Sequence, residues 1–190
     1  MNIGVFGGTF DPPHIGHLVA AQDASVVLYL DRVIFVPAAD PPHKRGALVS
    51  AASVRSEMLR ATIAGNPQFE ISTCELDRAG ASYTVDTLRE LAEQYPGAAL
   101  QLLVGVDQVR EFASWREPDQ IVKLAAVVML SRAGVAGPGA EADFVRRTVA
   151  VTRIDVSSTL IRTRVAAGMP IRYLVTDAVA KIIEREGLYR

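Results

Sequence analysis

Residues 2–17 of this chain read NIGVFGGTFDPPHIGH, an apolar run that passes through paired glycines and prolines to two histidines. The run over 3–6 is typical of a buried strand, and the prolines are typical of the start of a helix, which we expect over about 14–28. A strand, a glycine turn and a helix in this order predict an α/β fold with an anion-binding turn.

The rest of the chain continues this alternation of strand-like and helix-like segments. We expect further strands and helices at these positions: strands over 33–36, 69–73, 100–104, 126–130 and 149–154, and helices over 53–64, 85–95 and 175–187. The runs over 100–104 and 126–130 are continuously apolar, as in parallel strands that are covered on both faces. The sequence therefore predicts a doubly wound parallel sheet, built as one domain over residues 1–190.

Composition limits the partners and the compartment of the protein. The formal net charge is −1 at pH 7, so no basic field is available for nucleic acid or membranes, and neither is expected as a partner. The longest apolar runs, such as 124–130, are too short to span a bilayer. One cysteine, Cys74, excludes an internal disulfide, and no basic leader precedes the first strand, so we expect a cytoplasmic protein. Whether it forms a homo-oligomer stays open.

The first turn carries the residue types that bind phosphate. Gly7 and Gly8 allow the backbone to turn sharply and to bring its N–H groups close to an anion. His14 and His17 lie on one face of the first helical turn, where unpaired N–H groups and the helix dipole favour phosphate, and Thr9 offers a hydroxyl. The alternative interpretation, a plain turn with two solvated or core histidines, is less favoured because the pattern occurs as a unit.

Two common nucleotide motifs are absent from the sequence. No G-x-x-x-x-G-K-[ST] phosphate loop occurs, and the glycines at 4, 7 and 8 do not form G-x-G-x-x-G, which disfavours a dinucleotide-binding dehydrogenase. A second candidate phosphate site is the stretch 157–162, which reads SSTLIR. Its serines and threonine favour a helix start whose N–H groups and arginine would bind phosphate. Ordinary helix capping with a surface arginine explains this stretch equally well when it is considered alone.

Taken together, the two motifs resemble those of the nucleotidyltransferase superfamily of the His-x-Gly-His type. Within that superfamily, the chain is similar over nearly its full length to the bacterial nicotinate-nucleotide adenylyltransferases. The similarity rests on His14, where phosphopantetheine adenylyltransferases usually carry Thr, and on four further stretches: 41–44 (PPHK), 82–88 (SYTVDTL), 105–107 (GVD) and 115–116 (WR). One departure is Ala133, where the family pattern has Pro.

The resemblance implies a Rossmann-like fold and a reaction of NAD biosynthesis. ATP and nicotinate mononucleotide would give nicotinate adenine dinucleotide and pyrophosphate, because the mononucleotide phosphate attacks the α-phosphorus of ATP directly. Positioning and charge neutralisation would supply the catalysis, with Mg²⁺ bound through the ATP phosphates. No covalent enzyme intermediate is needed.

The resemblance also implies roles for individual residues. The catalytic residues would be His14, His17 and Arg162, with His17 donating nearest the α-phosphate. ATP would contact residues that follow four of the expected strands: Gly7, Gly8, Thr9, Phe10, His17, Gly105, Asp107, Arg132, Ser157, Ser158 and Arg162. The mononucleotide would contact His43 and Lys44 through its phosphate, Thr84 through its carboxylate and Trp115 through its ring. For Trp115, a partly buried core position is the alternative.

Other functions remain open at this stage. A phosphopantetheine or nicotinamide-mononucleotide adenylyltransferase would use the same nucleotide site with a different acceptor. A non-catalytic nucleotide-binding regulator is disfavoured because His14, His17 and Arg162 are all present. The tetrapeptide HIGH over 14–17 also occurs in class I aminoacyl-tRNA synthetases, but these need a longer chain and a lysine-rich loop, neither of which is evident.

Overall fold

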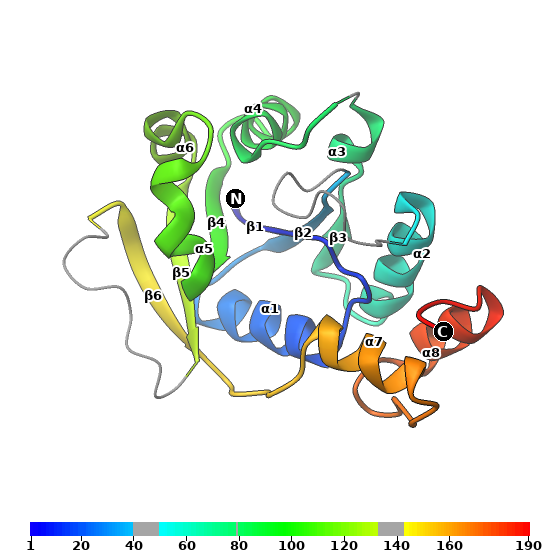
Figure 1. The fold of residues 1–190 in the computed structure, drawn as a ribbon. Helices are drawn as coiled ribbons and strands as arrows, with labels where there is room; N and C mark the ends of the chain where they lie inside the picture. Colours follow the sequence, from blue (N-terminus) through cyan, green and yellow to red (C-terminus); the bar gives the residue numbers. More distant parts are fainter. Residues whose placement is uncertain (40–49, 79, 133–142) are drawn as a thin grey trace.

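The central element of the protein is a parallel β-sheet. The computed structural model describes residues 1–39, 50–78, 80–132 and 143–190, and these contain six strands in the order β3-β2-β1-β4-β5-β6 (Figure 1). All neighbouring pairs are parallel. The strands are β1 (Asn2–Gly8), β2 (Arg32–Pro37), β3 (Phe69–Ile71), β4 (Ala99–Gly105), β5 (Ala126–Arg132) and β6 (Val145–Val151).

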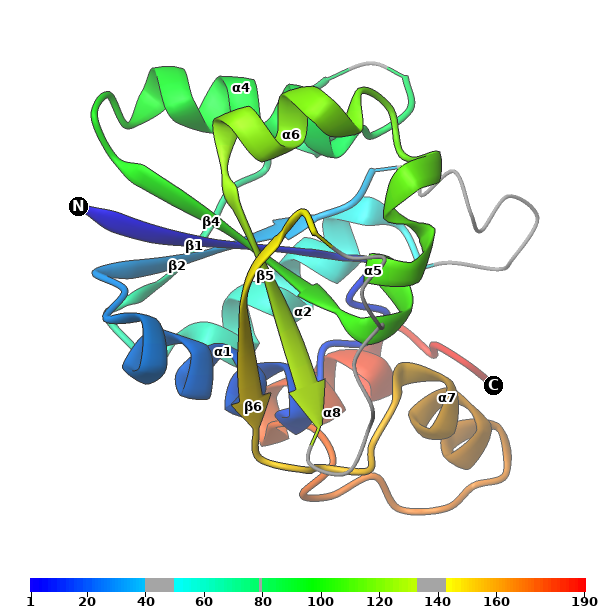
Figure 2. The same ribbon diagram turned by 90° about the vertical axis from the view of Figure 1, so that its left-hand side faces the viewer.

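Helices cover both faces of the sheet, as Figures 1 and 2 show. One face carries α1 (Ile15–Leu28) and α2 (Ala52–Ile63), and the other carries α4 (Thr84–Gln94), α5 (Val106–Glu111) and α6 (Pro118–Leu124). The short helix α3 (Cys74–Asp77) precedes α4, and a 3-10 turn (Phe112–Ser114) joins α5 to α6. The predicted doubly wound parallel sheet is therefore confirmed.

The alternation of side chains along each strand explains how the core divides. Successive strand residues point to opposite faces. Val5 pairs with Ile34 on β2 and with Leu102 on β4, and all three pack in the cluster that contains α4 and α6. The next residue, Phe6, pairs with Phe35, and both pack in the cluster that contains α1 and α2. Because both faces are covered, the inner strands carry apolar residues at consecutive positions.

A third apolar cluster holds the end of the chain. Helices α7 (Ser158–Ala166) and α8 (Asp177–Arg185) pack beside α2 through buried side chains that include Met58, Ile161 and Val179. Thr176 caps α8, since its side chain accepts a hydrogen bond from the Val179 N–H group. After α8, Gly187 has φ = 60°, a left-handed conformation in which glycine carries no steric penalty, and the last residues turn back there.

Most predicted elements agree with the structure, and one strand was misplaced. The sequence predicted the sixth strand over 149–154, whereas β6 spans Val145–Val151. β6 is an edge strand, and its residues 146–148 are exposed, so its first half lacks the apolar signal of an inner strand. Helices α3, α5 and α6 were not predicted because they are short. None of the helices in the described ranges is long and apolar enough to cross a membrane.

The order of the strands reverses at one place in the sheet, between β1 and β4. The chain runs outward from β1 through β2 to β3, and then returns to the other side of β1 through β4, β5 and β6. The connections therefore leave in opposite directions beyond the carboxyl ends of β1 and β4. Ligands of open α/β sheets bind at such a reversal of strand order, since the diverging connections open a crevice there.

Candidate functional site

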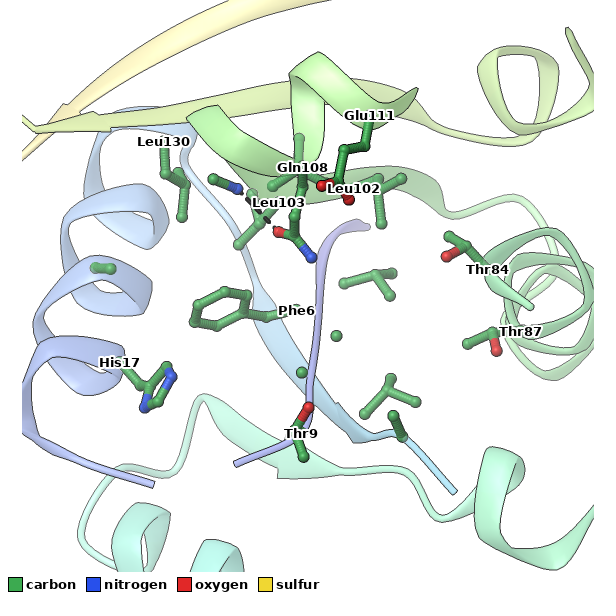
Figure 3. Close-up of a pocket in the computed structure, with 18 of the residues that line it drawn as sticks. Phe6, Thr9, His17, Thr84, Thr87, Leu102, Leu103, Gln108, Glu111 and Leu130 are labelled. Atoms are coloured by element: carbon green, nitrogen blue, oxygen red, sulfur yellow. Dashed lines mark hydrogen bonds between the residues drawn. The ribbon is translucent and has the colours of Figure 1, made fainter. Parts of the chain in front are cut away.

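A cavity of about 730 Å³ opens at this reversal, beyond the carboxyl ends of β1 and β4. Figure 3 shows that its walls come from different elements: His17 of α1 stands opposite Thr84 and Thr87 of α4, with Gln108 and Glu111 of α5 between them. The cavity lining includes these predicted site residues: Gly7, Gly8, Thr9, His14, His17, Thr84, Gly105, Trp115 and Ser157. Residues far apart in the sequence thus surround one space large enough for two small substrates.

The first turn is shaped by the packing of one phenylalanine. Phe10 has φ = 49°, and its ring, 2% exposed, packs against the rings of Phe6 and Phe35. A Cβ atom on Gly8 would lie 2.9 Å from the end of the Phe10 ring, so only glycine fits there. The resemblance assigns Phe10 to ATP binding. In the structure its side chain packs in the core and does not line the cavity, and the ring holds the turn against the sheet.

The two histidines of the motif form a stacked pair at the start of α1. Their ring centroids are 3.7 Å apart and the rings are 26° from parallel. His14 is the N-cap residue, and its backbone N–H donates a hydrogen bond to Nδ1 of His17 over 3.1 Å. Gly16 makes room for the stack, since a Cβ atom there would lie 3.1 Å from the His14 ring. Because Nδ1 of His17 accepts, the proton of the neutral ring lies on Nε2.

The surroundings of His17 favour its neutral form. Burial, with a smaller contribution from His14, lowers the pKa of His17 well below its ordinary value of 6.5. The rings of Phe6 and Phe10 pack edge-on against it at centroid distances of 6.2 and 5.0 Å. At neutral pH, His17 therefore offers a single polar hydrogen, on Nε2, at the wall of the cavity. This suits a hydrogen-bond donor to a phosphate oxygen rather than a charged ligand group.

The depressed pKa predicts how the stability of the protein depends on pH. Below about pH 6.5 the unfolded chain protonates His17 while the folded protein does not, so the free energy of unfolding decreases as the pH falls from 6.5. The loss from this group is at most about 1.4 kcal/mol per pH unit. Urea unfolding between pH 8 and pH 5 should show a smaller loss for His17→Gln than for the original chain. Equal losses of unfolding free energy in both proteins would contradict the lowered pKa assigned to His17.

The second motif contacts the first through hydrogen bonds. Ser157 is the N-cap of α7 and accepts from the N–H group of Leu160 over 3.1 Å. The Ser158 hydroxyl donates to the carbonyl oxygen of Pro12 over 2.9 Å, and Nη1 of Arg162 donates to that of Asp11 over 2.8 Å. Ser157 lines the cavity, and Ser158 and Arg162 hold the backbone of the turn through these two bonds. The two stretches that the sequence offered as separate phosphate sites meet in space.

The end of β4 supplies a further part of the wall. Gly105 lines the cavity, and its N–H group donates to Oε1 of Gln108 over 3.0 Å (Figure 3). The Asp107 side chain is 93% exposed, pairs with Arg110 over 3.3 Å and is not among the residues that line the cavity. The structure thus brings Gly105, but not the Asp107 carboxylate, to the wall of the cavity.

The opposite wall contains a helix start and two large side chains. Thr84 begins α4, so the positive end of the α4 dipole faces the cavity. Trp115 is half-buried, packs against Phe112 at 5.4 Å and also lines the cavity, so it is both a core contact and part of the wall. The Arg116 guanidinium lies 4.7 Å from the centre of the Tyr83 ring and adds a cation to this wall. From the sequence alone, Arg116 has no predicted role.

A buried carboxyl group lies beneath this helix start. Glu75 is 9% exposed, and its Oε1 accepts a hydrogen bond from the Thr87 hydroxyl over 2.7 Å. Burial raises the pKa of Glu75, although Thr87 and Ser82 oppose this by hydrogen bonding. Its neighbour Cys74 is buried. Glu75 connects α3 to α4 and thereby fixes the first turn of α4.

Some predicted site residues fall outside what the structure describes. His43 and Lys44 lie within 40–49, and Ala133 lies within 133–142, so their placement is not part of the described ranges. Arg132 is the last residue of β5, at the same edge of the sheet as the other candidates, but its side chain is likewise outside the description. The assignment of these residues stays a prediction from the sequence.

The structure also brings residues to the site that the sequence analysis missed. Arg55 of α2 is 1% exposed and donates to three backbone carbonyl oxygens, those of Thr9 (2.9 Å), Ser50 (3.0 Å) and Ala39 (3.2 Å). It thereby connects the ends of β1 and β2. A signal was available: Arg55 shares the buried face of α2 with Met58 and Leu59, at helical spacing, where an unpaired charge would be costly.

Comparison with known proteins agrees with this geometry. Residues 5–164, from β1 into α7, match the model of the cytidylyltransferase-like family. The chain belongs to this family. The match begins with the strand that precedes the glycine turn and ends within the helix that carries Arg162. It therefore includes both stretches that the sequence offered as candidate phosphate sites.

Relatives of this family member are similar over their full length. A probable nicotinate-nucleotide adenylyltransferase of Thermus thermophilus is 45% identical over 190 residues, with all of both chains covered. One of Shouchella clausii is 43% identical over 187 residues, covering 98% of this chain and 96% of the relative. The resemblance inferred from the sequence is thus confirmed, and this family member is an enzyme.

The fold extends to more distant proteins. A Plasmodium falciparum nicotinic acid mononucleotide adenylyltransferase, solved in complex with NaAD, superposes with a TM-score of 0.79 at 17% identity, covering 99% of this chain and 97% of that one. At this identity the similarity supports the shared fold. The predicted Rossmann-like nucleotidyltransferase fold is confirmed.

Proposed function

We propose that this cytidylyltransferase-like enzyme transfers the adenylyl group of ATP to nicotinate mononucleotide, which yields nicotinate adenine dinucleotide and pyrophosphate in NAD biosynthesis. The observation that carries the proposal is one cavity with anion-binding features on opposite walls, His14 and His17 at the start of α1 and Thr84 at the start of α4. The names of its full-length relatives support this reaction. We place the enzyme in the cytoplasm and expect no nucleic-acid partner.

On the ATP side, the triphosphate would lie between the first turn and the start of α7. The backbone of 7–9 and the Thr9 hydroxyl would donate to phosphate oxygens, and His17 would donate from Nε2 to the α-phosphate. The Arg162 guanidinium would neutralise charge on the β- and γ-phosphates, and the hydroxyls of Ser157 and Ser158 would donate hydrogen bonds to them. Gly105 would contact the ribose from the cavity wall, and Asp107 would contact it once its exposed carboxylate leaves Arg110.

The reaction then needs no nucleophile from the protein. The phosphate oxygen of the mononucleotide forms a bond to the α-phosphorus of ATP as the bond to the β-phosphate oxygen breaks, and pyrophosphate leaves with the bonding electrons. The donated Nε2–H of His17 stabilises charge that grows on the α-phosphate oxygens. ATP would enter with Mg²⁺ held by phosphate oxygens and water, a binding mode that needs no protein carboxylate cluster.

On the acceptor side, the wall formed by α4 and Arg116 suits a carboxylate. The positive end of the α4 dipole at Thr84 favours an anionic group over a neutral amide, and the Arg116 guanidinium, which also pairs with Asp86 and Glu117, would add to this preference. Trp115 would stack on the pyridine ring, and His43 with Lys44 would meet the mononucleotide phosphate. This arrangement favours nicotinate over nicotinamide mononucleotide as the acceptor.

Removing the tryptophan ring should weaken acceptor binding selectively. In Trp115→Ala we expect the KM for nicotinate mononucleotide to rise about tenfold, because stacking on one base contributes about 1–3 kcal/mol, with kcat changed much less. The KM for ATP should stay within about twofold. Trp115→Phe keeps an aromatic face and should recover part of the affinity. A loss confined to kcat in steady-state assays would contradict the stacking role.

The proposed reaction is tested by comparing acceptors at fixed MgATP. Pyrophosphate release should be fastest with nicotinate mononucleotide, slower with nicotinamide mononucleotide and absent with phosphopantetheine. Turnover only with phosphopantetheine would replace the acceptor while keeping the reaction class. ATP binding without turnover with any acceptor would favour a nucleotide-binding regulator. Exchange of pyrophosphate into ATP that depends on an amino acid would favour a synthetase-like activity.

A further inference from the structure

The end of the chain reaches back to the nucleotide turn. The hydroxyl of Tyr189, the next-to-last residue, donates a hydrogen bond to Oδ1 of Asp11 over 2.5 Å. Oδ2 of the same carboxylate accepts from the Ser50 N–H group over 3.2 Å, and the Ser50 hydroxyl lies 3.2 Å from the Tyr189 oxygen. Asp11 and Ser50 are 39 residues apart in the chain, and Ser50 and Tyr189 are 139 residues apart. These hydrogen bonds therefore join three distant segments.

Asp11 belongs to the turn that lines the cavity. It is 3% exposed, lies two residues after Thr9, and its carbonyl oxygen accepts from Arg162. A buried carboxylate is stable only where donors surround it, so the position of Asp11 depends on the groups that face it. Those groups are Tyr189 and Ser50 through hydrogen bonds and the Arg55 guanidinium through its charge.

The fold fixes the direction from which Tyr189 approaches. Its ring packs against the apolar cluster formed by α2, α7 and α8, so the hydroxyl is held at the edge of that cluster. The N–H group of Leu188 donates to the carbonyl oxygen of Ile183, and Gly187 supplies the left-handed turn after α8. Burial, together with the bond to Asp11, raises the pKa of Tyr189, so its hydroxyl keeps the proton that it donates.

We propose that Tyr189 is a positioning residue for ATP, which through Asp11 holds the turn over 9–12 in the conformation that receives the triphosphate. Tyr189 does not line the cavity itself, so it acts through the turn rather than by contact with the nucleotide. Without its hydroxyl, ATP has to order the turn on binding, and the affinity for ATP falls. The proposal rests on the proposed function for the identity of the nucleotide.

The test removes one oxygen atom. In Tyr189→Phe the ring still packs with α8, and the dissociation constant for MgATP, measured by calorimetry without acceptor, should rise about tenfold, as expected for a lost hydrogen bond to a charged group. The dissociation constant for nicotinate mononucleotide should stay within about twofold, since its wall lies on the other side of the cavity. An unchanged affinity for MgATP overturns the proposal.

Two matched controls separate positioning from general stability. Tyr29→Phe removes the same atom from a tyrosine that is 83% exposed at the end of α1, and it should leave both affinities unchanged. Ile183→Val removes a methylene from the same cluster as Tyr189, which lowers stability, and it too should leave the affinity for MgATP unchanged. If Ile183→Val weakens MgATP binding as much as Tyr189→Phe does, or if Tyr189→Phe weakens mononucleotide binding equally, the role is structural and the proposal fails.

A double-mutant cycle tests the route through Asp11. If Tyr189 acts through this carboxylate, Tyr189→Phe should weaken MgATP binding much less in an Asp11→Asn background than in the original chain. Equal losses in both backgrounds contradict that route. Because calorimetry needs no turnover, an unchanged MgATP affinity overturns the role of Tyr189, whereas failure of the acceptor assay with intact MgATP binding overturns the proposed reaction instead.

Discussion

Replacing His17 by alanine should reduce kcat about 10²- to 10³-fold, the cost of removing one preorganised donor to a developing oxyanion. The effect is expected to be large because Nδ1 of His17 is already occupied by the His14 N–H group, which leaves Nε2–H fixed and directed to the cavity. The KM values should change much less than kcat if the bond forms mainly in the transition state. Single-turnover kinetics with saturating ATP and acceptor would measure the chemical step.

A control for this variant is needed because His17 also packs. Its ring contacts Phe6, Phe10 and His14, so alanine leaves a space and lowers stability as well. His17→Gln fills more of that space and offers an amide N–H near the position of Nε2, so it should recover part of kcat. Activity of His17→Ala within about fivefold of the original chain would show that this side chain is not the donor.

Replacing Arg55 by methionine should destabilise the protein by about 3–5 kcal/mol. The change removes three hydrogen bonds to backbone carbonyl oxygens and leaves the buried Asp11 carboxylate without the nearby positive charge, while the side-chain volume is nearly kept. Guanidinium chloride unfolding followed by circular dichroism would measure the difference. Because Arg55 then no longer joins the backbones of Thr9 and Ser50, the affinity for MgATP should fall as well.

The same substitution at an exposed arginine provides the comparison. The Arg153 side chain is 63% exposed and pairs with Asp155 on the surface. Arg153→Met should therefore change the free energy of unfolding by no more than about 0.5 kcal/mol. In Arg55→Lys, one ammonium group cannot reach all three carbonyl oxygens, so an intermediate loss is expected. Equal losses in Arg55→Met and Arg153→Met would contradict the role assigned to the buried hydrogen bonds.

The sequence predicted the fold well because its main signals are local. Four inner strands are short apolar runs, and the helix over 85–95 shows its buried face at residues such as Val85, Leu88 and Leu91. The edge strand β6 was misplaced because one half of it faces solvent and lacks that signal. Short helices such as α5 and α6 present less than two turns of pattern, so periodicity does not distinguish them from loops.

The candidate site was predicted in part, and the missing part depends on contacts between distant segments. The glycine turn and the histidines are contiguous in the sequence, so their residue types and spacing can be recognised without knowing the fold. Asp11 lies inside that motif, yet its partners Arg55 and Tyr189 come from 44 and 178 residues away, and only the packing of α2 and α8 brings them together. Arg116 was part of a matching stretch but had no predicted role, because its place beside Tyr83 in the cavity wall depends on how α4 packs.

The most direct test of the proposed reaction follows the α-phosphorus of ATP. ATP that carries a radioactive α-phosphate is incubated with the enzyme, Mg²⁺ and nicotinate mononucleotide, and the products are separated by chromatography. We predict that the label appears in nicotinate adenine dinucleotide, in equal amount to the unlabelled pyrophosphate released, and that none remains bound to the protein. Label that stays in ATP, appears as AMP or becomes attached to the protein would contradict direct adenylyl transfer to this acceptor.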